Sequence, residues 1–503
     1  MNAATPLVSG ISRSYLAHHR VCPLRQATSR TSDEQVLAQP SLVVAVTSGS
    51  LLDALDDLSI AYGSPVTTVT VAPRELDRLL AQLAVPADEV VVEGEGEGPD
   101  AGPTGDGALA DVRDLANQPP VIRYVNLLIR EAFGARASDI HVEATRDGNL
   151  TVRFRLDGVL VDAMQPPPAA IAPAVVSRLK LLAELDIAER RRPQDGRIRV
   201  RLESRELDLR VSTVPTLHGE SVVLRLLERG GRPVELSSLG MTPEVLRKAQ
   251  WLCLLAHGMI IVTGPTGSGK TTTMYAMIIG RPTRAEKIIT VEDPVEYELE
   301  GVAQVPVDRQ RGVTIASALR SILRQDPDVI MVGEIRDAET AEVAIQAAMT
   351  GHLVFSTLHT TDAVGAIPRL LDLGVADYLV SGTLQGILAQ RLVRLICDSC
   401  RTEYQPSPET VAALCGDAPQ GLRLTRGAGC PECRGTGYRG RTGLFELVVM
   451  TDEMREAIAG HARRPDLVSI AKSQGTIPLR ADGWAKVQAG LTTVEEVVRV
   501  TTD

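Results

Sequence analysis

The spacing of apolar residues divides the chain into segments of different periodicity. From about residue 239 onward, continuous apolar runs at 259–263, 287–291, 329–332 and 353–357 alternate with stretches of helical spacing. Such runs are typical of strands buried on both faces of a parallel sheet, and their alternation with helices predicts a βαβ architecture. We expect helices after about residue 375, leading to a cysteine-rich segment, and a helical region that closes the chain.

The middle segment, residues 109–235, shows two other patterns. Apolar residues first recur at helical spacing, and later stretches alternate polar and apolar residues as strands do. Helices are expected at 120–133 and 169–185, and strands at 150–156, 197–202, 207–214 and 221–227. The combination predicts an α+β domain.

Residues 1–92 predict a small N-terminal domain. It contains an apolar run at 43–47, helical spacing at 51–58 and 73–83, and a strand-like alternation at 66–71. These few elements predict a small unit that is separate from the rest of the chain.

An acidic, glycine-rich stretch marks the clearest boundary in the chain. Residues 93–108 contain alternating Glu and Gly and cannot form a core, so they predict a flexible linker. The remaining boundary is expected after the middle domain, which leaves a third domain at 236–503 with a cysteine-rich subdomain at 396–434.

Composition and charge narrow the class of protein. A chain of 503 residues is too long for one ordinary core. Its formal charge is 53 − 63 = −10 and its aromatic content is 3%, which disfavours an extended nucleic-acid-binding surface. No run of about 18 apolar residues occurs, and the first thirty residues lack the apolar core of a signal peptide. We expect a cytoplasmic protein whose membrane contacts are made through partners.

Gly264 to Thr271 form a complete G-x-x-x-x-G-K-[ST] phosphate-binding loop. Its glycines let backbone N–H groups point at phosphate oxygens, Lys270 supplies positive charge, and Thr271 offers a hydroxyl to Mg²⁺. A chance glycine-rich turn is the alternative, but the loop follows an apolar run and precedes helical spacing, as the motif requires. We expect ATP to be bound by Gly264, Pro265, Thr266, Gly267, Ser268, Gly269, Lys270, Thr271 and Thr272.

Two further apolar runs end in carboxylates. Glu334 follows one of them, and Glu292, Asp293 and Glu296 follow the other. Because ligands gather at the carboxyl ends of parallel strands, Glu334 is predicted to hold Mg²⁺ or its water. ATP hydrolysis also needs a group that orients the attacking water, and Glu296 is the candidate catalytic base, with Glu292 and Asp293 as metal or water contacts. The alternative for each is a solvated acid in a polar turn.

His352 and His359 flank the apolar run at 353–357. His359 is a candidate sensor of the γ-phosphate through a hydrogen bond, although a lone histidine is commonly structural. Because a whole strand separates the two histidines, they do not predict a shared metal site.

Four of the seven cysteines form two C-x-x-C pairs, Cys397 with Cys400 and Cys430 with Cys433. Four thiolates in two such pairs are typical of tetrahedral Zn²⁺ with no open position, which indicates a structural site. A redox pair or unpaired thiols are the alternatives.

Arg197, Arg210 and Arg225 lie in strand-like stretches of the middle domain. Motor ATPases need an arginine that neutralises charge on the transferring phosphate, supplied by a neighbouring domain or subunit. From spacing alone, however, a solvated sheet face is the favoured interpretation of these residues.

Several of these residues together resemble a known family. The run Ala137-Ser-Asp-Ile-His-Val-Glu143, the run from Leu185 to Gly196, the nucleotide motifs and the two cysteine pairs resemble the ATPases of type II secretion and type IV pilus assembly. The similarity covers about residues 110–450 and is to the extension motors. Retraction motors, which lack the four-cysteine insert, resemble the chain less.

The resemblance implies a RecA-like P-loop domain preceded by an α+β, PAS-like domain, assembled as a homohexamer. In the family, the strands near Glu296, Glu334 and His359 carry the Asp, Walker B and His boxes. Two middle-domain arginines reach the nucleotide, and the matching positions are Arg210 and Arg225. The implied cofactors are ATP, Mg²⁺ and Zn²⁺.

The resemblance also implies a function and a place of work. The motor would be cytoplasmic and associated with the inner membrane through platform proteins that bind its N-terminal domain, and it would drive pseudopilus assembly and protein export. The short N-terminal domain is closer to the secretion type, and pilus extension is the alternative. A nucleic-acid motor and a nucleotide sensor that does not hydrolyse ATP are disfavoured. The basic triplet Arg190 to Arg192 has no explanation in the sequence.

Overall fold

The computed structural model of the chain shows two compact units, residues 1–229 and 230–503. The linker expected at 93–108 lies outside the described residues, as do the first fifteen residues and most of the helix expected at 51–58. The structure describes residues 16, 19–24, 42–47, 54–55, 58–59, 65–82, 91–92, 115–162, 164–202, 205–228, 234–282, 285–415 and 421–502.

The N-terminal domain contains a small sheet in the order β1-β2-β3. β1 and β2 are antiparallel, whereas β2 and β3 are parallel. Apolar residues of the sheet pack with Leu76 and Leu79 of helix α3. The strands are β1 (Val21–Leu24), β2 (Leu42–Val46) and β3 (Val66–Thr70), and α3 spans Pro73–Gln82.

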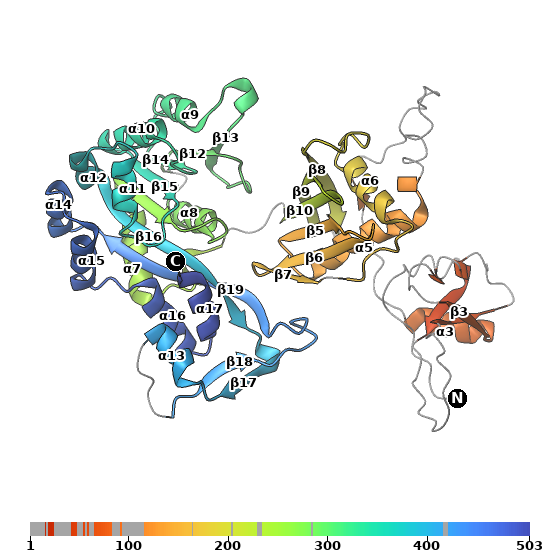
Figure 1. Cartoon of the computed structure of the whole chain (residues 1–503). Coiled ribbons are helices and arrows are strands. Elements are labelled where there is room, and N and C mark those ends of the chain that lie inside the picture. The colour runs from red at the N-terminus through yellow and green to blue at the C-terminus, as the bar shows by residue number, and fades with distance from the viewer. Residues whose placement is uncertain are drawn as a thin grey trace. The chain divides into compact units, whose positions relative to one another are not determined.

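The middle domain is a seven-stranded antiparallel sheet with two helices on one face (Figure 1). Its strand order is β4-β8-β9-β10-β5-β6-β7. The elements are β4 (Val91–Val92), α5 (Pro119–Gly134), β5 (Asp139–Ala144), β6 (Leu150–Leu156), β7 (Val159–Asp162), α6 (Ala172–Leu182), β8 (Gln194–Leu202), β9 (Arg205–Thr216) and β10 (Gly219–Glu228).

The expected α+β pattern of the middle domain is confirmed. Val121, Val125 and Leu128 of α5 pack on Ile140 and Val142 of the sheet. Because successive side chains of a strand point to opposite faces, the neighbours of these sheet residues form a second, polar face. The strands β5 and β7 were not expected, since both are short and depend on their partners in the sheet.

The C-terminal unit is built on a second seven-stranded sheet, in the order β13-β12-β14-β15-β11-β16-β19. All neighbours are parallel except β16 and β19, which are antiparallel. The elements before the cysteines are α7 (Pro243–Cys253), β11 (Gly258–Thr263), α8 (Lys270–Ile279), β12 (Ile288–Glu292), β13 (Val302–Pro306), α9 (Ile315–Ile322), β14 (Val329–Val332), α10 (Ala338–Met349), β15 (Leu353–Leu358), α11 (Ala366–Asp372), α12 (Asp377–Thr383) and β16 (Leu384–Ile396).

Separate cores cover the two faces of this sheet. Met259 and Ile261 of β11 pack toward α9 and α10, whereas Ile260 and Val262 pack toward α7 and α8. The continuous apolar runs of the sequence therefore arise because both faces of each strand are buried. This confirms the expected α/β fold with a mostly parallel sheet.

The expectation of helices between residue 375 and the cysteines is wrong for residues 384–396. α12 ends at Thr383, and the following residues form β16, which is thirteen residues long. The sequence Leu-Gln-Gly-Ile-Leu-Ala-Gln-Arg-Leu-Val-Arg-Leu-Ile has apolar spacings that suit either a helix or a buried strand. The partner strand β19 (Tyr438–Val449) lies more than forty residues later, so no local signal announces the pairing.

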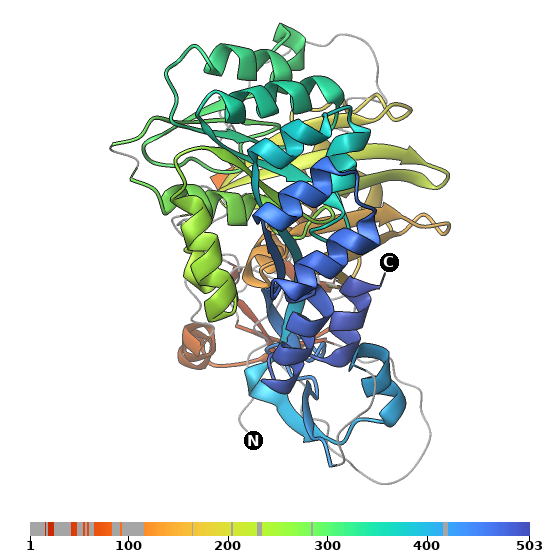
Figure 2. The same ribbon diagram turned by 90° about the vertical axis from the view of Figure 1, so that its left-hand side faces the viewer.

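The remaining elements surround the ends of β16 and β19. Helices α14 to α17, drawn in blue, close the chain as expected, and α16 and α17 lie beside these two strands (Figures 1 and 2). In the part of the chain that the structure describes, the helices are too short or too polar to cross a bilayer. These elements are β17 (Arg401–Tyr404), α13 (Pro408–Cys415), β18 (Leu424–Gly427), α14 (Asp452–Ala459), α15 (Arg464–Ser473), α16 (Leu479–Gln488) and α17 (Val494–Thr501).

Candidate functional site

Four loops meet at the carboxyl edge of the parallel sheet. The register pairs Thr263 of β11 with Leu358 of β15, and Val332 of β14 with both Ser356 of β15 and Val291 of β12. The segments that follow these strands therefore leave the sheet side by side. Such an edge is where open α/β folds bind ligands.

The phosphate-binding loop joins β11 to α8, and its glycines are required by geometry. Gly264, Gly267 and Gly269 all have positive φ, at 151°, 79° and 86°. A Cβ on Gly264 would lie 2.4 Å from the backbone carbonyl oxygen of Gln390. A Cβ on Gly269 would lie 2.8 Å from Nε2 of the Gln390 side chain. The loop is thus shaped against β16, and a side chain at either glycine would collide with that strand.

Lys270 begins α8, as the sequence predicts. Its Nζ donates to the carbonyl oxygens of Gly264 at 2.8 Å and Pro265 at 2.9 Å. Burial lowers the pKa of Lys270 to about 8, while the charge of Glu334 raises it and that of Arg391 lowers it further. The charge of Lys270 therefore interacts with those of both Glu334 and Arg391.

The hydroxyls that follow Lys270 differ in their surroundings. Thr271 and Thr272 are half-buried in the first turn of α8, whereas Thr273 is fully buried and donates to Oε1 of Gln390 at 2.6 Å. Thr271 and Thr272 therefore remain partly accessible next to the loop. Thr273 instead fixes the helix to β16.

Glu334 and His359, predicted from separate motifs, are neighbours. Oε2 of Glu334 lies 3.3 Å from Nε2 of His359 and 2.6 Å from Nε of Arg336. The Glu334 side chain is 15% exposed and that of His359 is 43% exposed, so the cluster faces outward from the sheet edge. Arg336 was missed by sequence reasoning, although it stands only two residues after Glu334.

Glu292 and Glu296 occupy different environments. Glu292 is 2% exposed, and its carboxylate accepts hydrogen bonds from Tyr275, from Thr290 at 2.5 Å and from Gln304 at 3.1 Å. A carboxylate satisfied in this way inside the protein is a poor metal or water contact. Glu296 is exposed, and its backbone N–H donates to the Tyr275 hydroxyl at 3.4 Å.

Gln304 of β13 holds the loop that carries Glu296. Its Nε2 donates to the Tyr297 carbonyl at 3.2 Å, and its Oε1 accepts from the Leu299 N–H at 2.7 Å. The P-loop helix reaches the same loop through Tyr275, whose ring packs edge-on against Tyr297 with centroids 4.7 Å apart. The loop is therefore fixed by two side chains that no sequence motif identified.

His352 has a structural environment. Its Nδ1 lies 2.9 Å from the carbonyl oxygen of Ala347 and 3.0 Å from the hydroxyl of Thr350. It precedes β15, at the opposite end of the strand from His359. This placement agrees with the expectation that the two histidines do not share a metal.

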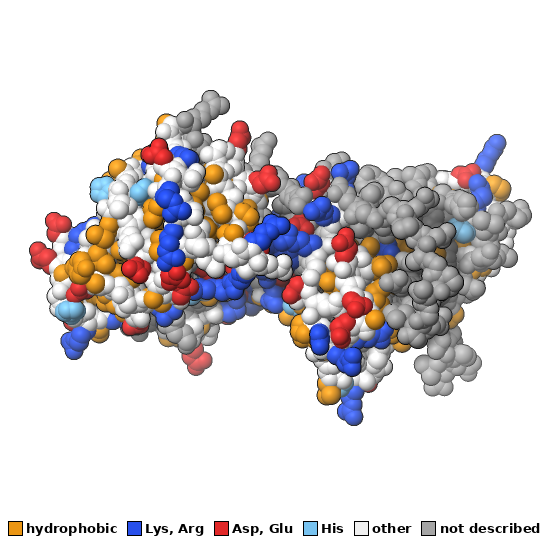
Figure 3. Space-filling model, turned by 90° about the horizontal axis from the view of Figure 1, so that it is seen from above, with side chains coloured by type: hydrophobic (Ala, Val, Ile, Leu, Met, Phe, Trp, Pro, Cys, Tyr) orange, Lys and Arg blue, Asp and Glu red, His pale blue; other side chains and the backbone are white. Residues whose placement is uncertain are grey.

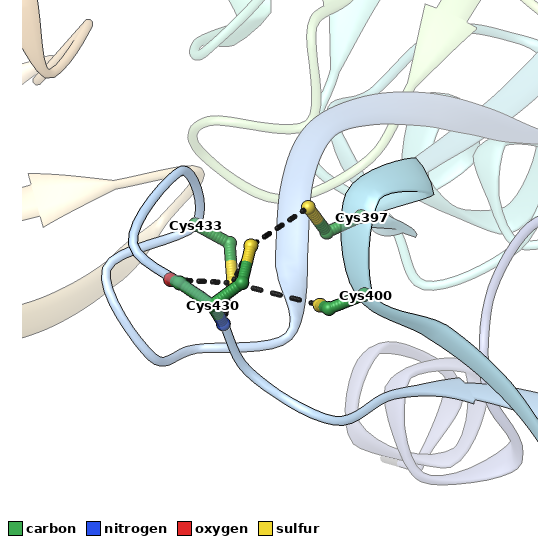
Figure 4. A group of neighbouring side chains, drawn as sticks. All are labelled: Cys397, Cys400, Cys430 and Cys433. Carbon is green, nitrogen blue, oxygen red and sulfur yellow. Dashed lines mark hydrogen bonds between the residues drawn. The ribbon is translucent and has the colours of Figure 1, made fainter.

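The two cysteine pairs come together at the far end of β16 and β19 (Figure 4). Sγ of Cys397 lies 3.8 Å from that of Cys430, Cys400 lies 3.8 Å from Cys433, and Cys430 lies 3.7 Å from Cys433. A Zn–S bond of about 2.3 Å in a tetrahedron separates the sulfurs by about 3.8 Å. The four thiols therefore have the spacing of a zinc site.

Backbone donors complete the surroundings of this cluster. The N–H groups of Cys430 and Gly437 donate to Sγ of Cys433 at 3.1 and 3.2 Å. Burial raises the pKa of the Cys433 thiol, but these and other hydrogen bonds outweigh it and bring the pKa down to about 6. Hydrogen bonds that favour a thiolate are those a metal-binding cysteine needs.

The three arginines of the middle domain form one row across its polar face. In the strand register, Arg197 of β8 lies opposite Arg210 of β9, Arg210 lies opposite Arg225 of β10, and Arg225 lies opposite Asp139 of β5. Asp139 is 6% exposed, and its carboxylate lies 3.1 Å from Nε of Arg225 and 3.5 Å from Nε of Arg155. Paired residues of antiparallel strands share a face, so the row is a feature of the sheet. The three arginines of the row and Asp139 line a shallow hollow together with Asp195 and Ser212.

Comparison with known proteins gives the family. A family model described as "Type II/IV secretion system protein" matches residues 114–499. The type II secretion system protein E of Xanthomonas campestris pv. campestris is 45% identical over 504 residues, which cover 99% of this chain and 86% of that protein. The protein of the same name from Pseudomonas aeruginosa is 49% identical over 391 residues, 78% of this chain and 77% of that protein.

A solved structure shows the same fold. The pilus retraction motor PilT with bound ADP is 28% identical and superposes with a TM-score of 0.51, covering 75% of this chain and 96% of that chain. Identity is thus higher to the secretion proteins than to this retraction motor, as the four-cysteine insert led us to expect. The chain belongs to the type II/IV secretion system protein family.

Proposed function

We propose that this chain is an ATPase motor that drives pseudopilus assembly and protein export by type II secretion. The observation that carries the proposal is the arrangement at the carboxyl edge of the parallel sheet. There the phosphate-binding loop with Lys270 lies within electrostatic reach of Glu334, which in turn contacts His359. The names of the relatives, such as the type II secretion system ATPase E of Vibrio cholerae, support the secretion role.

ATP binding would use the P-loop backbone and the first turn of α8. Lys270 now donates to two loop carbonyls, and in the complex it would donate to phosphate oxygens instead. Thr271 is the residue that would hold Mg²⁺, which neutralises charge on the β- and γ-phosphates. The loop from Gly264 to Thr271, with Thr272 beside it, would form the phosphate cradle.

Hydrolysis would use the acidic and basic groups around this cradle. We assign Glu296 as the base that orients the attacking water, and Glu334 as a contact for Mg²⁺ or its water. His359, hydrogen-bonded to Glu334, would report on the γ-phosphate. Arg210 and Arg225 would neutralise charge in the transition state, and the buried Asp139 beside Arg225 gives that side chain a defined direction.

The motor would work as a homohexamer in the cytoplasm, attached to the inner membrane through secretion platform proteins that bind residues 1–92. The four-cysteine cluster would hold one structural Zn²⁺. Membership of the family supports the assembly and the membrane attachment, and the spacing of the four cysteines supports the zinc.

Substitution of Lys270 tests the proposal. Lys270→Ala removes the positive charge of the phosphate cradle, so ATP turnover by the assembled protein should fall about a hundredfold or more. Lys248→Ala is the matched control, because Lys248 lies on α7 in an exposed pair with Glu244. Turnover by Lys270→Ala at the rate of this control would contradict the proposal.

Pilus extension by the same chemistry is the second candidate, favoured by the structural similarity to a pilus motor. Loss of secretion with normal surface pili after deletion of the gene would support the secretion role, and the reverse would support pilus extension. A nucleic-acid motor is less favoured, because the chain has a formal charge of −10 and 3% aromatic residues, although basic side chains gather in places on the face drawn in Figure 3. Stimulation of ATP turnover by single-stranded DNA would revive it.

A further inference from the structure

Arg391 lies on β16, next to the glutamine that backs the phosphate-binding loop. Its side chain is buried, with 7% exposed. The guanidinium donates to three backbone carbonyls: Nη1 to Gln390 at 3.1 Å, Nη2 to Thr361 at 2.5 Å and Nε to Val500 at 3.2 Å. One planar, permanently charged group therefore joins segments that are far apart in the sequence.

The first of these segments supports the phosphate-binding loop. A Cβ on Gly264 would lie 2.4 Å from the carbonyl oxygen of Gln390 and 3.2 Å from Nη1 of Arg391. The guanidinium thus lies directly behind the first residue of the loop. Its charge also lowers the pKa of Lys270, which shows that the two cations are close.

The second segment is the loop at 359–365 after β15, called the His loop below. Arg391 binds its Thr361 carbonyl, and Glu446 of β19 accepts a hydrogen bond from the N–H of Ala363 at 2.9 Å. Burial raises the pKa of Glu446, although its hydrogen bonds with backbone N–H groups and the charge of Arg391 act against the rise. The backbone of the His loop is therefore held by two buried side chains, Arg391 from β16 and Glu446 from β19.

The third segment is the end of α17. Val500 lies in the last turn of this helix, where carbonyls have no partner within the helix and carry the negative end of its dipole. Arg394, three residues further along β16, also contacts α17, through an ion pair with Glu496 at 2.6 Å. Of these two arginines, Arg391 is the one whose side chain also donates to the Thr361 carbonyl of the His loop and to the Gln390 carbonyl behind the phosphate-binding loop.

We propose that Arg391 is a positioning residue for ATP hydrolysis, which holds the His loop against the phosphate-binding loop and uses the end of α17 as its support. The proposal rests on the ATPase function proposed above and extends it to the C-terminal helix. Without the guanidinium, the cradle would still form around phosphate and Thr360 would still bind Thr263, but the His loop would lose its anchor at the Thr361 carbonyl, two residues after His359. The expected loss is therefore in turnover rather than in nucleotide affinity.

A comparison of two glutamine variants tests the proposal. In Arg391→Gln, we expect kcat for ATP to fall about tenfold while the Kd for ADP changes by less than about twofold. In the matched Arg394→Gln, which removes an ion pair with Glu496 of α17 but leaves the Val500 carbonyl in place, kcat should stay within about twofold of the wild type. Arg391→Lys should stay impaired, because an ammonium cannot reach three carbonyls in one plane. Equal losses of kcat in Arg391→Gln and Arg394→Gln would overturn the proposal.

Amide hydrogen exchange on the nucleotide-free chain gives a readout that does not depend on hydrolysis. Amides of residues 360–366 should exchange faster in Arg391→Gln than in Arg394→Gln, and unchanged exchange in Arg391→Gln would overturn the proposal. This result is separate from the outcome for Lys270→Ala, which decides whether the chain is an ATPase.

Two truncations test the support from α17. A chain that ends at Arg499 lacks the Val500 carbonyl and should show the loss of kcat seen in Arg391→Gln. A chain that ends at Thr501 keeps that carbonyl and should behave as the wild type. Equal activity of the two truncated chains would overturn the assignment of α17 as the support.

Discussion

At the scale of single residues, we expect the protonation of Lys270 to control phosphate binding. Burial brings its pKa in the nucleotide-free chain to about 8, well below the usual range for lysine. Only the protonated amine attracts phosphate, so binding must keep or restore the proton. The Kd for ADP should therefore be nearly constant below pH 8 and rise above it, approaching tenfold per pH unit, as calorimetry between about pH 7 and 9.5 would show.

The matched variant for this measurement is Lys270→Arg. A guanidinium stays charged over the whole range, so the rise in Kd above pH 8 should disappear even if affinity is lower overall. The same steep rise in Lys270→Arg would show that another group is responsible.

At the scale of elements, the antiparallel pair β16 and β19 connects the nucleotide site to the cysteine cluster. Gln390 of β16 backs the phosphate-binding loop, and Cys397 follows the last residue of the same strand. The Cys397 N–H donates to the carbonyl of Gly437, which directly precedes β19, at 3.0 Å. A metal at the cysteines would therefore tie the outer ends of both strands without entering the nucleotide site.

Removal of that metal should loosen the outer ends of β16 and β19. We expect about one zinc per chain, and Cys397→Ser should lose it, since structural zinc needs its full set of thiolates. Protease cleavage between residues 397 and 437 should then become faster, with a smaller effect on ADP affinity. Cys253→Ser is the control, because Cys253 lies on α7 outside the cluster and its loss should leave the zinc in place. Cleanly purified wild-type protein without zinc would contradict this prediction.

The elements also show what the sequence predicts and what it does not. The strands around Gly264, Glu334 and His359 were identified because each combines a continuous apolar run with a local motif. Gln390 and Arg391 were missed, because their importance comes from β16 lying next to β11, a pairing between residues more than a hundred positions apart. The same holds for Tyr275 and Gln304, which meet at Glu292 only in the folded chain.

The polar face of the middle domain was only partly predictable for a related reason. Spacing alone left Arg210 and Arg225 as residues of a solvated sheet face, and only the family resemblance singled them out. In the structure, cross-strand register places them in one row with Asp139. Register between β5, β9 and β10 depends on the whole sheet, so a single strand's sequence cannot show it.

At the scale of the whole molecule, we expect two neighbouring subunits of the proposed ring to build each nucleotide site. The P-loop belongs to residues 230–503, whereas Arg210 and Arg225 belong to the compact unit that ends at Arg229. In a closed ring with head-to-tail contacts, an arginine from one subunit can serve the nucleotide of the next. A chain with a damaged P-loop and a chain with damaged arginines would then each carry the part that the other lacks.

Mixed assemblies test this directly. Lys270→Ala and the double variant Arg210→Ala with Arg225→Ala should each be nearly inactive when assembled alone. If the arginines act between subunits, an equal mixture should recover about a quarter of the wild-type ATP turnover, because about a quarter of the interfaces then join an intact P-loop to intact arginines. A mixture of Lys270→Ala with Thr271→Ala should recover nothing, since both changes damage the same loop. No recovery in the first mixture, once mixed rings are confirmed by mass spectrometry, would show that the arginines do not serve a neighbouring subunit.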